Sequence, residues 1–248
     1  MCEEGAASAY PYAWRLPGPA RELGAQDFAR ARLALAQTLF ALGRFAQARE
    51  TTPETDCLPV DEGARAQGLQ ARCDILLGRE PATLPPPTTL TEHTESAYLA
   101  LLADRPGMLL AGISEHRLLA SADATATAWC EVFAIWAQAR LKHGFSQAGA
   151  HTALARLRPL TPAAAAHAEA VLAESAFHAA PAWSVVWLDA ALEQCARYAQ
   201  HHVEVRLLLC KSQALQATGQ IREAERFQKL AASLAKRQGL KQSAMTDG

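Results

Sequence analysis

Residues 198–240 read YAQHHVEVRLLLCKSQALQATGQIREAERFQKLAASLAKRQGL, and this stretch predicts two helices joined by a tight turn. Apolar or small residues recur on one face of each helix and at the turn between them, at Leu208, Leu215, Gly219, Ile221, Ala224 and Ala231. Glycine ends a helix readily because it adopts the left-handed backbone conformation without a steric penalty. Helices joined by so short a connection pack antiparallel, so the stretch predicts a helical hairpin.

The turn of this hairpin recurs along the chain. GQIREA at residues 219–224 matches GRFAQA at residues 43–48, and GFSQA at residues 144–148 is a further copy with its glycine shifted by one position. In each copy a large apolar residue opens the second helix, and an alanine follows three residues later. We expect the apolar residue to wedge between the two helices and the alanine to allow their close contact. Counted from the apolar position, the hairpins recur every 37 or 38 residues, at Met108, Phe145, Trp183 and Ile221.

This pattern resembles the tetratricopeptide repeat, whose signature has a glycine–x–aromatic–x–x–alanine turn between two helices. The resemblance spans residues 27–238, with its clearest copies at 35–48 and 208–231. The period slightly exceeds the roughly 34 residues that are usual for this repeat. The last unit looks most like the longer repeats in the ligand-sensing solenoids of large bacterial transcription activators. The resemblance implies an all-α fold, namely an α-solenoid of stacked antiparallel helical hairpins.

Breaks in the helical period divide the chain. We expect an irregular N-terminal tail at 1–18, an atypical N-terminal helical unit at 19–80, a proline-rich linker at 81–91, the repeats at 92–240 and a tail at 241–248. The linker contains three consecutive prolines, which cannot continue a helix. Within the repeats, the expected helices cover 92–104, 108–120, 122–142, 146–158, 163–179, 182–200, 202–217 and 221–238.

The composition supports helices and gives no sign of a membrane or a nucleic-acid partner. Alanine, the strongest helix former, makes up roughly a fifth of the 248 residues, whereas β-branched and aromatic clusters are missing. The formal net charge is −1, which argues against nucleic-acid binding through an overall positive field. No apolar run reaches the roughly 20 residues of a membrane span. Six scattered cysteines without a Cys-x-x-Cys pair suit a reducing compartment, so we expect a cytoplasmic protein.

No motif predicts catalysis, a cofactor or a metal. Phosphate-binding glycine loops and the Gly-x-Ser-x-Gly nucleophile motif are missing from the sequence. The histidines at 167, 178, 201 and 202 do not have the spacing of metal ligands, and Glu131, Glu169, Glu174 and Asp189 stand apart from one another in apolar helices. Each carboxylate could be a functional buried acid, but an ordinary surface or capping role is the more common one. We therefore expect no enzyme, no cofactor and no metal.

The resemblance also places a binding groove, because the first helix of each repeat lines the concave surface of such a solenoid. Carrying the groove-facing positions over gives Arg30, Leu33, Gln37 and Phe40 in the first unit, Phe133, Ala137 and Arg140 in the middle, and Arg206, Leu209, Gln213 and Gln216 in the last. Three arginines on one surface would suit a peptide that bears carboxylates.

Two other features have a structural and a functional interpretation. The tryptophans at 129, 136, 183 and 187 fit a hairpin core better than a ligand-stacking site. The last helix carries a basic stripe of Arg222, Arg226, Lys229, Lys236 and Arg237, opposite Phe227, Leu230, Ala231 and Leu234. The stripe could bind an acidic partner or nucleic acid, but a polar outer face is also what a terminal repeat requires, and we favour the latter.

The function that these features favour is a non-catalytic scaffold or adaptor that binds another protein or a peptide, with an acidic one as a candidate. The alternative is a regulatory ligand-sensing module that works with a separate transcription or signalling protein. The ends of the stack leave homodimer formation open.

Overall fold

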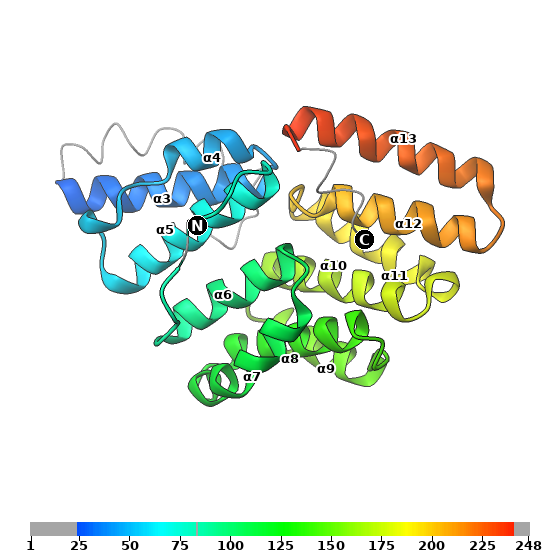
Figure 1. Ribbon diagram of the computed structural model, residues 1–248, viewed down its shortest axis with the longest axis horizontal. Helices are drawn as coiled ribbons and strands as arrows, with labels where there is room; N and C mark the ends of the chain where they lie inside the picture. Colours follow the sequence, from blue (N-terminus) through cyan, green and yellow to red (C-terminus); the bar gives the residue numbers. More distant parts are fainter. Residues whose placement is uncertain (1–23, 83, 241–248) are drawn as a thin grey trace.

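The computed structural model describes residues 24–82 and 84–240 (Figure 1), so both predicted tails lie outside the described residues. The described part is all-α, with eleven α-helices and two short 3-10 helices. The α-helices are α3 (Ala25–Ala41), α4 (Phe45–Thr51), α5 (Val60–Leu76), α6 (Leu90–Leu102), α7 (Pro106–Ala120), α8 (Ala124–Arg140), α9 (Gln147–Leu157), α10 (Pro162–Ala179), α11 (Val185–Arg197), α12 (Glu204–Ala217) and α13 (Ile221–Gln238).

The helices expected between residues 92 and 238 are all present. The last one has the predicted bounds, and α6 begins two residues earlier because Thr89 caps it. The Thr89 hydroxyl accepts a hydrogen bond from the Glu92 backbone N–H, and the Glu92 carboxylate accepts one from the Thr89 N–H. The helix expected over 182–200 is shorter, because a 3-10 turn at Pro181–Trp183 precedes α11.

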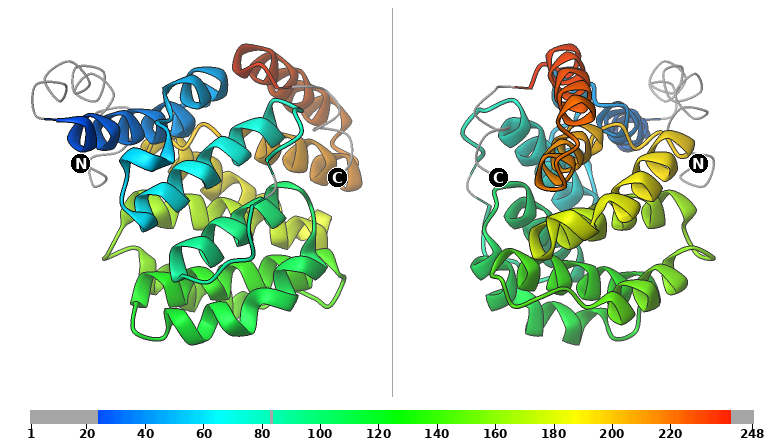
Figure 2. Two further views of the ribbon diagram at one scale, coloured as in Figure 1. Left: turned by 60° about the vertical axis from the view of Figure 1, so that its left-hand side comes forward. Right: turned by 90° about the vertical axis from the view of Figure 1, so that its right-hand side faces the viewer.

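Consecutive helices pack side by side, which is consistent with stacked hairpins. In addition, α6 contacts α8, α8 contacts α10, and α10 contacts α12, so these four helices form an inner row. The helices between and after them, α7, α9, α11 and α13, lie outside this row (Figures 1 and 2). The N-terminal unit differs in its connection to the rest: α5 and α6 pack against each other, but α5 ends at Leu76 and α6 begins only at Leu90, so a longer segment joins them.

The core follows this arrangement. One cluster of buried side chains runs from α6 to α10 and includes the fully buried Phe133 and Trp136, and a second cluster continues from α10 to α12. A third and smaller cluster lies among α3, α4 and α5 around the fully buried Phe45. Alanines fill many of the contacts in the first two clusters, which allows the helices to approach closely.

The N-terminal unit also meets the other end of the chain (Figure 2). The backbone N–H of His202, just before α12, donates to the carbonyl of Ala41 at the end of α3, with 3.2 Å between the two atoms. Gly43 faces Gln238 of α13 so closely that a Cβ atom at Gly43 would lie 2.5 Å from Nε2 of Gln238. The N-terminal unit is therefore in contact with α13 and with the loop before α12, and these segments border the space between them.

The proposed wedge residues need correction. Phe45 is fully buried as predicted, but the exposed fractions of Met108, Trp183 and Ile221 are 60%, 46% and 52%. The helices that follow these positions pack through later residues instead, such as Leu109 in α7, Leu188 in α11 and Ala224 in α13. In this chain a glycine turn therefore marks a hairpin, whereas the apolar residue after the glycine is not always buried between the two helices.

Two further expectations about side chains are partly wrong. Trp129 and Trp136 lie in the core, but Trp183 is exposed at the surface, where its ring lies 6.5 Å from that of Trp187. On α13 the buried residues are Ala224, Ala231, Ala235 and Gln238, so the apolar face is narrower than predicted and Leu230 is exposed. The basic stripe of α13 is exposed along its whole length. Within the described residues, no helix is both long and apolar enough to span a membrane.

Candidate binding groove

A cavity of about 380 Å3, which we call the groove, opens between the N-terminal unit and the inner row of helices. Its walls come from α5, α6, α8, α10 and α12, together with Leu240 after the last helix. Apolar side chains cover most of the surface, and the polar groups are Asp104, Arg140, Glu174, His178, His202, Arg206 and Gln213. The volume falls in the range of cavities that hold small ligands or a few side chains of a bound peptide.

Helix α12 presents a regular stripe to the groove. Arg206, Leu209 and Gln213 are three and four residues apart, so they lie on one face of the helix. The face has a guanidinium at one end, an apolar middle and an amide at the other end. The Gln213 side chain is exposed to solvent. This helix can therefore offer hydrogen bonds on both sides of an apolar contact.

Glu174 of α10 is the buried acid at the centre of the polar groups. Its carboxylate accepts hydrogen bonds from Arg206 and, at 3.4 Å, from Nε1 of Trp136, and the His178 ring lies 3.5 Å away. Burial alone would raise the pKa of Glu174, but the charge of Arg206 and the contact with His178 outweigh it and lower the pKa to about 2. Glu174 is therefore a stable anion that holds Arg206 in place.

A second ion pair joins the last residue of α8 to the turn after α6. Nε of Arg140 donates to Oδ1 of Asp104 at 2.6 Å, and Nη1 of Arg140 lies 3.0 Å from Nδ1 of His178. Asp104 has a φ angle of 52°, in the left-handed region that non-glycine residues seldom adopt. The positive groups of the groove are thus balanced by carboxylates of the chain itself.

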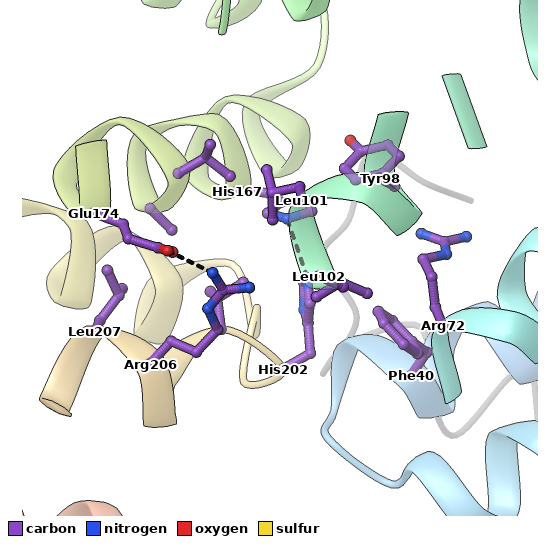
Figure 3. Close-up of a pocket in the computed structure, with 13 residues that line it drawn as sticks. Phe40, Arg72, Tyr98, Leu101, Leu102, His167, Glu174, His202, Arg206 and Leu207 are labelled. Atoms are coloured by element: carbon purple, nitrogen blue, oxygen red, sulfur yellow. Dashed lines mark hydrogen bonds and ion pairs between the residues drawn. The ribbon is translucent and has the colours of Figure 1, made fainter. Parts of the chain in front are cut away.

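A smaller void of about 20 Å3 adjoins the groove (Figure 3), and Leu102, Glu174, His202 and Arg206 line both. This volume is enough for about one water molecule. On its other side, the guanidinium of Arg72 lies 5.2 Å from the ring centre of Phe40 and 5.3 Å from that of Tyr98. Arg72 also pairs with Glu95 at 3.1 Å.

His167 and His202 meet beside this void. Their Nε2 atoms are 3.4 Å apart, and their ring centres are 4.6 Å apart with the planes nearly perpendicular. Burial, with a smaller contribution from Arg72 and Arg206, lowers the pKa of His167 to about 3, and burial together with His167 and Arg72 lowers the pKa of His202 well below its usual value. Both rings are therefore uncharged at neutral pH. Nδ1 of His202 is buried without a hydrogen-bond partner among the described residues.

The structure brings together only part of the predicted groove set. Arg140, Arg206 and Gln213 line the groove. Arg30 instead pairs with Glu62 at 2.9 Å, and Gln37 is exposed outside the groove lining. Phe133 does not face the groove, because it is fully buried between neighbouring helices in the core. These three placements correct the predicted groove.

Arg72, Tyr98 and Asp104 line the void or the groove but were not predicted from the sequence. Arg72 and Tyr98 belong to the atypical unit and its neighbour, for which no repeat pattern predicted an inward face. Asp104 could have been noticed because it precedes the Arg105-Pro106-Gly107 turn and lies one repeat before Arg140.

The described part of the chain contains no group of three or more His, Cys, Asp or Glu side chains that could hold a metal ion. Among comparisons with known proteins, no family model, no curated protein and no solved structure matches the chain. We therefore infer the role of the groove from the residues that line it.

Proposed function

We propose that this chain is a non-catalytic scaffold or adaptor protein that binds a segment of another protein in the groove. In this proposal the stacked hairpins form a tetratricopeptide-like α-solenoid, and the groove is its concave face. The observation that carries the proposal is the cavity of about 380 Å3 on the inner row, with apolar walls and polar groups at both ends. A peptide suits such a surface because its side chains use apolar walls while its backbone needs hydrogen-bond partners.

The charges of the groove favour a segment that is neutral or carries an isolated charge over a strongly acidic one. Arg206 and Arg140 already pair with Glu174 and Asp104, so a run of acidic residues would meet as much negative as positive charge. Arg206 contacts Glu174 through Nη2, which leaves its other N–H groups for a single carboxylate or for backbone carbonyls.

A regulatory role as a small-molecule sensor is the second candidate, in concert with a separate transcription or signalling protein. The small void that continues the groove favours it, because a compact ligand could fill the cavity and place a polar group beside His202. The two candidates differ in what remains outside the groove, since a peptide extends beyond the cavity and a small ligand does not.

Selection from a displayed library of random short peptides, followed by calorimetric titration of the selected peptides, tests the proposal. Gln213→Ala should weaken binding by about tenfold, because it removes one or two hydrogen bonds. Arg197→Ala is the matched control, since Arg197 is exposed on α11 and pairs only with Glu193 in the described part of the chain. Selected peptides that bind both variants equally would contradict the placement of the site. A failure to select any peptide, with a metabolite mixture protecting the chain from heat, would favour the sensor.

A further inference from the structure

The contact between the two ends of the chain is made largely of polar groups around His202, and we call it the clasp. We define the clasp by Ala41, Phe40, His167, His202 and Gln238. The His202 N–H donates to Ala41, its ring packs at 5.0 Å from that of Phe40, and the same ring meets His167 of α10. Nε2 of Gln238 donates to the carbonyl of His201 at 2.9 Å, which fixes the loop that carries His202.

The clasp borders the groove at His202. This residue lines both the groove and the small void, whereas Phe40 and His167 line the void alone. Separation of α3 from the loop before α12 would therefore remove Phe40 and Ala41 from beside His202, where the void meets the groove. The ring of His202 can stay in its place only while it is uncharged, since its Nδ1 atom is buried without an acceptor and its Nε2 atom faces another histidine.

The groups around the two rings disfavour positive charge from several directions. Arg72 faces them from α5, Arg206 and His201 from α12 and the loop before it, and Tyr98 of α6 stacks on His167 at 5.4 Å. One group acts in the opposite sense: the Ala41 carbonyl of α3, which accepts the His202 backbone N–H, raises the pKa of His202, but burial together with His167 and Arg72 outweighs it. The acids Glu174 and Glu95 are each paired with an arginine, with Arg206 and Arg72 respectively.

We propose that His167 and His202 form an acid-sensitive clasp that holds the end of α3 against the loop before α12 at neutral pH and releases it when the two imidazoles are protonated. This inference rests on the proposed binding function and names its regulation. A segment in the groove contacts His202 while the clasp is shut, and acidification weakens its binding by displacing His202. The opening involves proton uptake by two imidazoles and no change in covalent bonds.

The sign of the pH effect follows from the depressed pKa values. Both histidines are neutral in the closed form and regain a pKa near 6.5 when exposed, so opening takes up protons below about pH 6.5. Each histidine makes the ratio of open to closed chains rise about tenfold per pH unit, and the pair gives about a hundredfold per unit. This window lies above the range in which exposed carboxylates titrate, at about pH 4.

The opening is measured by energy transfer between dyes on the full-length chain. The dyes are attached at Ala46→Cys and Ser233→Cys, both exposed positions on either side of the clasp, in a chain that also carries Cys2→Ser and Cys57→Ser so that the remaining native thiols are the four buried ones. We expect the transfer efficiency to fall between about pH 7.5 and 4.5 while the helical circular dichroism is retained. No fall in that range would overturn the inference.

Two variants and one control test whether the two histidines cause the change in transfer efficiency with pH. His167→Gln or His202→Gln should reduce the pH slope from about a hundredfold to about tenfold per unit, and the double variant should remove it. His143→Gln, at an exposed turn, should keep the wild-type slope. If a clasp variant fails to fold, the pH slope of the open-to-closed ratio in the wild-type chain still tests the inference. A slope of tenfold or less per pH unit contradicts the participation of two histidines.

The measurement needs no ligand, so its failure can be told apart from failure of the binding proposal. Absent opening together with peptide binding at neutral pH overturns the clasp alone. Opening without any peptide binding supports the clasp and contradicts the peptide-binding function.

Discussion

The N-terminal unit (α3–α5) and the helices that follow it (α6–α13, here the stack) are held by different kinds of contact. The stack has two large apolar clusters that share α10, and each inner helix contacts the next one. The N-terminal unit has its own small cluster, against which Leu102 of the stack and Leu240 after α13 also pack, and α5 lies against α6. To these apolar contacts it adds buried polar ones, at Arg72–Glu95 and at the clasp.

This difference indicates which part of the molecule can respond to a change in pH. Apolar packing within the stack does not depend on pH, whereas a buried polar contact is stable only in one protonation state. Because the groove lies between the two regions, its walls combine side chains of both. The predictions below change one region at a time, from the largest expected effect to the smallest.

Trp136→Ala should produce the largest loss of stability. Trp136 is the largest fully buried side chain of the stack, so its truncation should lower the free energy of unfolding by about 3–5 kcal/mol. Phe45→Ala removes a fully buried ring of the N-terminal unit. We expect it to expose α3, α4 and α5 to hydrogen exchange while the stack stays protected. Equal loss of protection in both regions after Phe45→Ala would show that they unfold as one unit.

Loss of the Glu174 ion pair should weaken the stack at a lower pH than that at which the clasp opens. The pKa of Glu174 is about 2 in the folded chain and near 4.5 when exposed, so its contribution to stability is present above about pH 4.5 and is lost as the pH falls toward 2. A shift of this size corresponds to about 3 kcal/mol. Urea unfolding at about pH 6 and pH 3 measures the loss, and Glu174→Gln should make it smaller. An unchanged loss in the variant would remove Glu174 as its source.

Gly68→Ala should loosen the contact between α5 and α6. A Cβ atom at Gly68 would lie 2.2 Å from Oε2 of Glu95 and 2.7 Å from its Cγ atom, so Glu95 must move away from Arg72. We expect a loss of about 1–3 kcal/mol in urea unfolding. Gly112→Ala in α7 is the control, because open space surrounds it, and it should gain about 0.5–1 kcal/mol through helix propensity. Similar effects of both substitutions would argue against close packing of α5 on α6 at Gly68.

Thr89→Ala should have the smallest effect, at the helix start that follows the linker. It removes the capping hydrogen bond of α6 and should cost about 1 kcal/mol. Thr161→Ala is matched to it, since Thr161 also precedes a helix but makes no capping bond with its side chain, and its hydroxyl is buried without a partner among the described residues. We expect Thr161→Ala to be nearly neutral in thermal unfolding. A loss at Thr161 that equals the loss at Thr89 would contradict this comparison.

The sequence predicts the helices of the stack because their signal is local. Glycine turns, Pro162 at the start of α10 and the apolar period of α13 all lie within a few residues of the feature they define. The orientation of α8 could not be predicted in the same way. This helix is surrounded by neighbours and is buried on almost every side, so it has no polar face from which to infer that Phe133 points into the core.

The candidate site was predicted only in part because it joins segments that are distant in the sequence. Three residues of the predicted set, Arg140, Arg206 and Gln213, do line the groove. The clasp brings Ala41 next to His202, and no pattern in either segment indicates that contact. The paired histidines at 201 and 202 were visible, but their spacing did not reveal that His167 would meet one of them.

Site-specific photo-crosslinking in cells that produce the full-length chain tests the central claim, that the groove is the binding site. A photoreactive amino acid replaces Leu209, which lines the groove, or Leu118, which is exposed on α7 of the outer layer. We predict that a discrete partner is crosslinked from position 209 and not from position 118, and that Gln213→Ala reduces its yield. Crosslinking of the same partner from position 118 alone would contradict the account.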